Sequence, residues 1–282
     1  MKLIECPRDA MQGLEEFIPT DVKVTYLNQL LKVGFDTLDF GSFVSPKAIP
    51  QMRDTAEVLD QLEISNSKTR LLAIIANVRG AETACQFDRI HFLGFPLSIS
   101  ETFQQRNTNK SIAEALNTVN EIQELCTRHN KKQVVYISMG FGNPYGDPYD
   151  LEIVAKFTDI LTTLQVPIIS LADTIGVSQP TQIESLFTSL IKSFPNVEFG
   201  AHLHSTPTTS LEKIAAAYQA GCQRFDGAIK GYGGCPMAKD ELVGNMATET
   251  ILAFLDSKQA APVLNRTEFI KAMELAERVF PH

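Results

Sequence analysis

Long apolar runs and basic tracts are both missing from this sequence of 282 residues. A membrane-spanning helix needs roughly 20 consecutive apolar residues, and no run approaches that length, so we expect no membrane association. The net charge is −8, and without a basic tract this argues against a nucleic-acid partner. An anionic substrate would have to be met by a few local cations.

Paired cysteines are missing as well. The five cysteines stand far apart at positions 6, 85, 126, 222 and 235, and no CxxC pair occurs. An odd, scattered set argues against a disulfide framework or a thiolate zinc site, and it favours a reducing cytoplasm. The chain opens with MKLIEC, which already resembles a strand, so we expect no signal peptide. Four of the cysteines lie in apolar or helical contexts, whereas Cys235 lies among glycines.

A dinucleotide-binding fingerprint, G-x-G-x-x-G, is also absent after the first predicted strand, which weakens a Rossmann interpretation. The chain instead alternates short apolar runs with longer amphipathic ones. The predicted strands lie near 2–6, 36–40, 69–75, 89–94, 133–138, 167–172, 197–202 and 224–228. The predicted helices lie near 20–33, 50–62, 79–86, 109–130, 148–164, 178–193, 208–220 and 240–256. Eight such units predict an α/β fold, a (β/α)₈ TIM barrel in one domain over 1–282 with a C-terminal helical cap over 259–282.

Charged and polar residues gather at the C-terminal ends of the predicted strands, where barrel enzymes place their chemistry. They are Glu5, Arg8 and Asp9 after the first strand, Asp39, Gly41 and Ser42 after the second, Ser138 after the fifth, Asp173 and Thr174 after the sixth, His202 and His204 after the seventh, and 230–235 after the eighth. Core packing alone would not require this arrangement. The sequence therefore predicts a reactive site at this end of the barrel.

His202 and His204 are one residue apart at the end of an apolar run, so in a strand both rings face the same side and can meet one ion. A lone HxH pair is more often two packed or exposed histidines than a metal site. Their place at a strand end, with Asp9 after the first strand, favours the metal interpretation. Arg8 and Asp9 taken alone would read as an ion pair at a helix entry.

Several motifs in order resemble one family. ECPRDAMQ, GSFVSPKAIPQM, SLADTIGV, HLH and GYGGCPMAKDELVGNMATE look like 3-hydroxy-3-methylglutaryl-CoA lyase, and SETFQQRNTNKS resembles that family's loop after the fourth strand. The match runs from about residue 4 to 254. That family belongs to a superfamily of metal-dependent barrels that make or break carbon–carbon bonds.

The resemblance implies a divalent cation, Mg²⁺ or Mn²⁺, bound by Asp9, His202 and His204 with Asn245 as a further oxygen ligand, although imidazole also admits zinc or cobalt. Arg8 would polarise the substrate carbonyl, and Cys235 would transfer a proton. Asp39 and His202 are further catalytic candidates. Candidates for contacting the substrate or supporting the site are Gln12, Ser42, Asp173, Thr174 and Glu249.

Some of these assignments keep a structural alternative. Asp173 would equally well cap the turn that follows it, and Asp39 would serve as a loop anchor. Lys47, Arg106 and Lys230 are as plausible on a solvated surface as against CoA phosphates, so no CoA-binding residue is assigned. Two departures from the family bear on the substrate: Asp39 stands where the family has a glutamate, and Ser205 stands where it has an aspartate.

The implied activity is cleavage of 3-hydroxy-3-methylglutaryl-CoA to acetyl-CoA and acetoacetate, a step of leucine degradation and ketone-body formation, by a cytoplasmic homodimer. The departures keep a second hypothesis open, a lyase that acts on a different 3-hydroxyacyl-CoA. A third is a metal-binding barrel without turnover. Arg8 and Cys235 argue against the third, because neither is needed merely to hold an ion.

Overall fold

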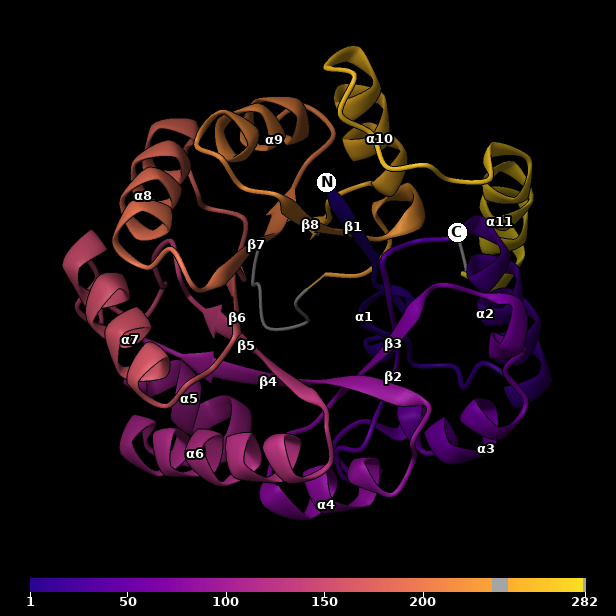
Figure 1. Ribbon diagram of the computed structural model, residues 1–282, viewed down its shortest axis with the longest axis horizontal. Coiled ribbons are helices and arrows are strands. Elements are labelled where there is room, and N and C mark those ends of the chain that lie inside the picture. Colours follow the sequence, from indigo (N-terminus) through magenta and orange to yellow (C-terminus); the bar gives the residue numbers. More distant parts are fainter. Residues whose placement is uncertain (235–242, 281–282) are drawn as a thin grey trace.

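The computed structural model describes residues 1–234 and 243–280, and within these ranges eight parallel strands close into a barrel surrounded by helices (Figure 1). The barrel strands are β1 (Lys2–Glu5), β2 (Thr37–Ser42), β3 (Arg70–Ile74), β4 (Ile90–Ser98), β5 (Lys132–Ser138), β6 (Ile168–Asp173), β7 (Glu198–Ser205) and β8 (Arg224–Gly227). Each strand pairs with its sequence neighbours, and β8 pairs with β1 to close the ring. The predicted TIM barrel is confirmed.

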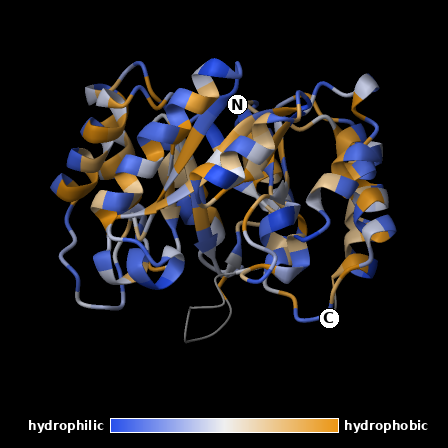
Figure 2. Cartoon of the chain, turned by 90° about the horizontal axis from the view of Figure 1, so that it is seen from below, coloured by the Kyte–Doolittle hydropathy of each residue, from blue (hydrophilic) through white to orange (hydrophobic). Residues whose placement is uncertain are grey.

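Helices follow the strands in the order expected of a TIM barrel. They are α1 (Pro7–Gln12), α2 (Thr20–Val33), α3 (Thr55–Asp60), α4 (Val78–Cys85), α5 (Glu101–Thr108), α6 (Ile112–Arg128), α7 (Leu151–Thr163), α8 (Pro180–Ser193), α9 (Ser210–Gln219), α10 (Thr248–Ser257) and α11 (Arg266–Val279). The helices carry both hydrophobic and hydrophilic faces (Figure 2). Among the described residues, no helix is long and apolar enough to cross a membrane.

Alternation along the strands separates two apolar regions. Leu71 and Ala73 of β3 point outward into the large core that the helices cover, whereas Leu72 and Ile74 belong to a smaller cluster with Tyr136. Successive strand side chains point to opposite faces, so this smaller cluster fills the barrel interior on the side of β3 to β6. The interior on the side of β7 and β8 holds buried polar side chains instead, among them His204, Arg224 and Asp226.

The C-terminal helix α11 lies against α2 in the outer ring (Figure 1). Phe269 packs edge-on to Phe35, and Phe280 packs edge-on to Tyr26. The backbone N–H of Asn265 donates to the carbonyl of Val33. The predicted C-terminal helix is therefore confirmed as an element that covers α2 and the start of β2.

Two helices and one strand were not predicted, and one predicted helix began too early. Helices α1 and α5 lie in segments that were read as loops. The helix predicted over 240–256 is wrong for residues 243–247, because Gly244–Asn245 form β9, which pairs antiparallel with β7. Residues 240–242 lie outside the described ranges. Helix α10 itself begins at Thr248.

Candidate active site

Short helix α1 positions the first group of predicted site residues. Pro7 stands at its first position, where the missing N–H costs nothing. The helix places Arg8, Asp9 and Gln12 at the C-terminal mouth of the barrel, where all three line a pocket of about 360 Å³. His202, His204 and Thr174 line the same pocket. Residues far apart in the chain thus line one pocket.

The metal-ligand candidates come together at this mouth. The ligand atoms of Asp9, His202 and His204 all lie within 4.8 Å of one another. Asn245 on β9 lies opposite His204 of β7 in the strand register. Its Nδ2 donates hydrogen bonds to Oδ2 of Asp9 at 2.8 Å and to the carbonyl of Tyr232 at 3.0 Å. The amide oxygen of Asn245 is therefore the side-chain atom left to coordinate a cation. One carboxylate, two imidazoles and one amide form a mixed donor set that suits a divalent cation.

The protonation states of Asp9 and His204 favour cation binding. Burial alone would raise the pKa of Asp9, but Arg8 and the two histidines outweigh it and lower the pKa to about 2. Burial, assisted by His202, lowers the pKa of His204 to about 4. Both groups are thus in their ligand forms at neutral pH.

His204 also suits a cation, because its ring nitrogens lack hydrogen bonds of normal geometry to the described residues. Both ring nitrogens are buried, and neither makes a hydrogen bond of normal geometry within residues 1–234 and 243–280; the Thr174 backbone makes a weaker hydrogen-bonding contact with the ring. A buried polar atom left unpaired costs free energy. A metal ion would remove that cost by taking one of the two nitrogens.

Arg8 is held by three partners. Its Nε and Nη2 donate to the carboxylate of Asp39, with Nη2 at 2.6 Å from Oδ2, while Nη1 donates to Asp9 at 3.0 Å and to Gln12 at 2.8 Å. The forked pairing with Asp39 fixes the plane of the guanidinium. Gln12 in turn donates to Asp9 at 2.8 Å. The Arg8 guanidinium is therefore fixed in place directly beside the Asp9 carboxylate.

Asp39 lies behind Arg8 and does not line the pocket. The strand β2 extends to Ser42, so Asp39 lies within the strand rather than after it, with its side chain 1% exposed. Burial raises the pKa of Asp39 to about 6, even though Arg8 opposes the shift. At neutral pH the carboxyl is ionised, and it accepts two hydrogen bonds from Arg8 that set the orientation of the guanidinium.

The remaining candidates fall into two groups. Thr174 lines the pocket, and its Oγ1 accepts a hydrogen bond from the backbone N–H of Met139. Asp173 accepts hydrogen bonds from Ser178 and from Nζ of Lys213 and lies outside the pocket lining, which favours the turn-capping alternative.

Ser42 and Glu249 make local hydrogen bonds. Ser42 accepts one from the backbone N–H of Val44, and Glu249 accepts one from the backbone N–H of Lys230. Neither Ser42 nor Glu249 lines the pocket. Cys235 lies outside the described residues.

Glycines let the backbone around β9 approach α1 closely. Gly233 adopts a left-handed backbone with φ +87, and a Cβ built there would lie 2.7 Å from Cα of Ala10 and 2.9 Å from Nδ2 of Asn245. Gly244 is tighter still, because its Cβ would lie 2.3 Å from the carbonyl oxygen of Gly231. A side chain at either position would push this segment off the metal-ligand candidates.

Two charged residues of the site region were not assigned a role from the sequence. Asp226 of β8 lies 3.2 Å from Nδ1 of His202. Burial alone would lower the pKa of His202, but the hydrogen bond to Asp226 raises it overall. Glu5, at the end of β1, accepts hydrogen bonds from the N–H of Ile229 at 2.8 Å and from Oγ1 of Thr248 at 2.6 Å, so it ties β1 to the connection between β8 and α10.

Glu5 gives a stability prediction. Burial raises the pKa of Glu5 from 4.5 to about 8. A carboxyl with a raised pKa favours the folded state most below its unfolded pKa, and this contribution is lost as the pH rises through the folded pKa. Relative to Glu5→Gln, a neutral mimic that does not titrate, the wild type should lose about 1.4 kcal/mol of stability per pH unit between roughly pH 4.5 and 8.

The measurement is thermal or urea unfolding of the two proteins from pH 5 to pH 9. Glu15→Gln, at an exposed position, serves as a control that should track the wild type. Parallel stability curves for wild type and Glu5→Gln would show that Glu5 is ionised in the folded protein.

Fold and site together define a TIM-barrel protein with a candidate divalent-metal centre beside a fixed arginine. Residues 3–276 match the HMGL-like family model. The chain belongs to the HMGL-like family.

Individual relatives agree with that membership. The chain is 34% identical over 250 residues to hydroxymethylglutaryl-CoA lyase YngG of Bacillus subtilis, covering 89% of this chain and 83% of the relative. It is 32% identical to the 3-hydroxy-3-isohexenylglutaryl-CoA/hydroxy-methylglutaryl-CoA lyase of Pseudomonas aeruginosa, covering 91% and 85%. An HMG-CoA lyase from Acinetobacter baumannii, solved with coenzyme A and 3-methylmalate, superposes with a TM-score of 0.91 at 28% identity, covering 99% of this chain and 90% of that one.

Proposed function

We propose that this protein is a divalent-metal-dependent carbon–carbon lyase that cleaves 3-hydroxy-3-methylglutaryl-CoA to acetyl-CoA and acetoacetate. The observation that carries the proposal is the meeting, in one pocket, of the Asp9, His202 and His204 donors with the fixed guanidinium of Arg8. Relatives named as lyases of this substrate, at about one third identity over most of the chain, support the substrate class.

Each part of the site has a role in this reaction. Asp9, His202, His204 and the amide oxygen of Asn245 would hold a Mg²⁺ or Mn²⁺ ion. Such an ion supplies Lewis acidity that lowers the barrier to deprotonating the tertiary hydroxyl. When the carbon–carbon bond breaks, negative charge develops on the thioester oxygen, and Arg8 provides a fixed cation for it. Cys235 remains our proposed proton donor to the released methylene carbon, on the basis of its sequence motif.

His202 and Asp39 were both candidates for accepting the hydroxyl proton. As a metal ligand, His202 must be neutral and has only its other ring nitrogen free to accept a proton. Nδ1 faces Asp226 within the barrel. The geometry therefore supports the ligand role of His202, and it supports Asp39 as the residue that orients Arg8. The hydroxyl proton would then pass to a bound water, the third acceptor compatible with the sequence.

A different 3-hydroxyacyl-CoA is the second candidate substrate, favoured by one feature of the pocket. The pocket lining includes several apolar side chains, namely Val44, Ala48, Ile49, Ile74 and Phe103. An apolar lining of this size would accept a longer substituent at carbon 3 than methyl. The Pseudomonas aeruginosa relative is named for such a substrate as well.

The proposed function is tested by measuring acetyl-CoA release from purified protein with Mg²⁺ or Mn²⁺ added. The panel should contain 3-hydroxy-3-methylglutaryl-CoA, homologues with longer alkyl groups at carbon 3, and 3-hydroxybutyryl-CoA. We expect cleavage of the methyl compound. Preference for a longer homologue would favour the second candidate, and metal binding without cleavage of any thioester would favour a barrel without turnover. The cytoplasmic location and the homodimer stay predictions, testable by fractionation and by light scattering.

A further inference from the structure

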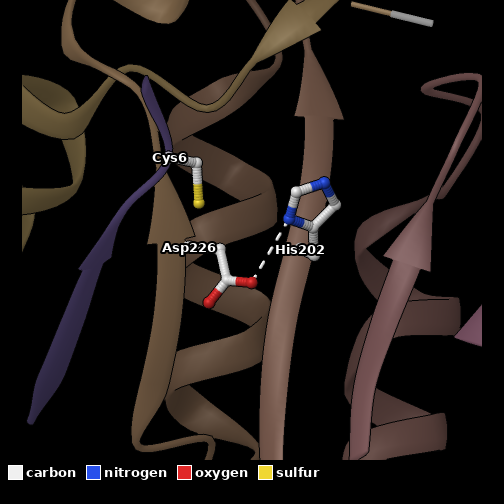
Figure 3. Close-up of side chains that lie close together, drawn as sticks. All are labelled: Cys6, His202 and Asp226. Atoms are coloured by element: carbon white, nitrogen blue, oxygen red, sulfur yellow. Dashed lines mark hydrogen bonds and ion pairs between the residues drawn. The ribbon is translucent and has the colours of Figure 1, made fainter. Parts of the chain in front are cut away.

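A second group of potential ligand atoms lies deeper in the barrel, beneath the pocket. Cys6, His202 and Asp226 come from the end of β1, from β7 and from β8, and their side chains converge in the interior (Figure 3). Nδ1 of His202 lies 3.2 Å from Oδ2 of Asp226, and the Asp226 side chain is 0% exposed. This group needs an explanation, because a fully buried carboxylate is expensive unless it is paired.

A second metal ion is not the explanation that this group supports. Nε of Arg224 lies 3.9 Å from Oδ1 of Asp226, so a cation bound to Asp226 would be repelled by the guanidinium. Burial and the nearby carboxylates raise the pKa of the Cys6 thiol, which keeps it in the form that binds metals weakly. The hydrogen bond to His202 already occupies the other carboxylate oxygen.

The two histidines of the HLH motif differ in the hydrogen-bond partners of their rings. His202 has a buried carboxylate on Nδ1, whereas neither ring nitrogen of His204 has a hydrogen-bond partner among the residues that the structure describes. A carboxylate on one nitrogen of a histidine fixes the tautomer, since the N–H must point toward it. Nε2 of His202 is then left unprotonated and available to an ion at the pocket.

A buried arginine balances the negative charge of Asp226. Arg224, two residues earlier on the same inward face of β8, is fully buried and provides the compensating positive charge. Gly200 leaves room for it, because a Cβ there would lie 3.0 Å from Cδ of Arg224. Oγ of Ser170 makes a longer contact of 3.4 Å with Oδ2 of Asp226. Arg224 therefore balances the charge of Asp226 without a hydrogen bond to it, and the shortest hydrogen bond of the carboxylate goes to His202.

We propose that Asp226 is a positioning residue, which holds His202 as the Nδ1–H tautomer and directs Nε2 toward a cation shared with Asp9 and His204. This inference rests on the cation site of the proposed function. It adds a residue outside the pocket whose effect on the cation passes entirely through the His202 ring. The effect on metal affinity of losing such a partner is about 10–100-fold.

The first measurement needs no variant. The chain has five histidines, so ¹⁵N spectra of the full-length protein can be assigned by single His→Gln substitutions. We expect His202 to carry its proton on Nδ1 in the metal-free protein. A neutral His202 protonated on Nε2 would overturn the inference.

The second measurement is the Mn²⁺ dissociation constant, followed by electron paramagnetic resonance. Asp226→Asn should weaken Mn²⁺ binding about 10-fold, and Asp226→Ala by up to about 100-fold, with loss of the tautomer preference. Ser170→Ala, which removes only the longer contact to the same carboxylate, should bind Mn²⁺ like the wild type. Near-ultraviolet circular dichroism confirms that each variant is folded.

A double variant separates positioning from simple charge compensation. If Asp226 only balances Arg224, Arg224→Gln combined with Asp226→Asn should recover wild-type Mn²⁺ affinity. We expect the fold to be recovered and the affinity to stay about 10-fold weaker. Wild-type affinity in folded Asp226→Asn, or its recovery in the double variant, would overturn the inference. Absence of Mn²⁺ binding in the wild type would instead overturn the cation site of the proposed function.

Discussion

Replacing Arg8 with lysine is expected to lower turnover about 10²–10³-fold, the loss typical of removing a fixed donor to a developing oxyanion. Lysine keeps the positive charge but not the planar fork. In the protein that fork donates at once to Asp39, Asp9 and Gln12. A single ammonium group cannot satisfy all three and also present a donor at a defined point in the pocket. The loss should therefore appear in kcat, with a smaller change in KM.

Arg8→Ala is a less clean test, because it would leave the Asp39 carboxylate buried without its partner. Removing one member of a buried ion pair typically costs about 3–5 kcal/mol of stability. Arg8→Met combined with Asp39→Asn removes both charges and tests turnover in a stable background. Arg70→Lys is a matched control, since Nη2 of Arg70 donates to both carboxylate oxygens of Asp36 in a partly exposed ion pair outside the pocket.

Mn²⁺ affinity should be measured on the same variants. We expect Arg8→Lys to change it by only a few-fold, because Asp9 and both histidines remain. Near-normal kcat with a strongly raised KM would mean that Arg8 only binds the substrate and does not stabilise the charge that develops during cleavage.

The barrel and the pairing of His202 with His204 were predictable because both depend on local periodicity. Eight apolar runs separated by amphipathic ones predict eight strand–helix units, and two residues at i and i+2 on a strand share a face. Asp9 followed from its place after the first strand, since all parallel strands of a barrel end at the same mouth. No long-range contact had to be known for these predictions.

Short elements were missed because their stability comes from tertiary contacts. Helix α1 has six residues, too few to show a helical period. Helix α5 is mostly polar, and it is held by Ser100, whose Oγ accepts from the N–H of Phe103, and by Asp147, which accepts from Thr102. Strand β9 has two residues and is defined by its pairing with β7. Propensity is a weak signal in such segments.

Partners far apart in sequence were also missed. Arg8 and Asp39 are 31 residues apart, and nothing local to either residue shows that they pair. Asp226 was placed in a predicted strand but was given no role. One signal was available: Arg224 and Asp226 are charged residues at i and i+2 in an otherwise apolar strand, and charges on an inward face require a partner. That signal predicts a buried ion pair but does not identify His202 as the third member.

Removal of the divalent cation should abolish cleavage, and this is the largest effect that the site predicts. EDTA should remove activity, and added Mg²⁺ or Mn²⁺ should restore it. The reason lies in the charge of the substrate: deprotonating a tertiary hydroxyl near a carboxylate places two negative charges together, and Arg8 is already engaged by Asp39 and Asp9. Among the described residues that line the pocket, Arg8 is the one lysine or arginine, so they supply no further fixed cation for this step.

His204→Ala tests the same site by substitution and should weaken Mn²⁺ binding and turnover by at least about 10-fold. His204 suits the test because its ring is neutral and buried and makes no hydrogen bond of normal geometry to the described residues, so its loss removes only a weak contact with the Thr174 backbone. His129→Ala, at an exposed position after α6, is the matched control and should behave like the wild type. Unchanged activity in protein shown by elemental analysis to be metal-free would mean that Asp9, His202 and His204 serve another purpose. In that case the support for cleavage would reduce to Arg8, whose ion pairs do not depend on a metal, and the proposed proton donor Cys235.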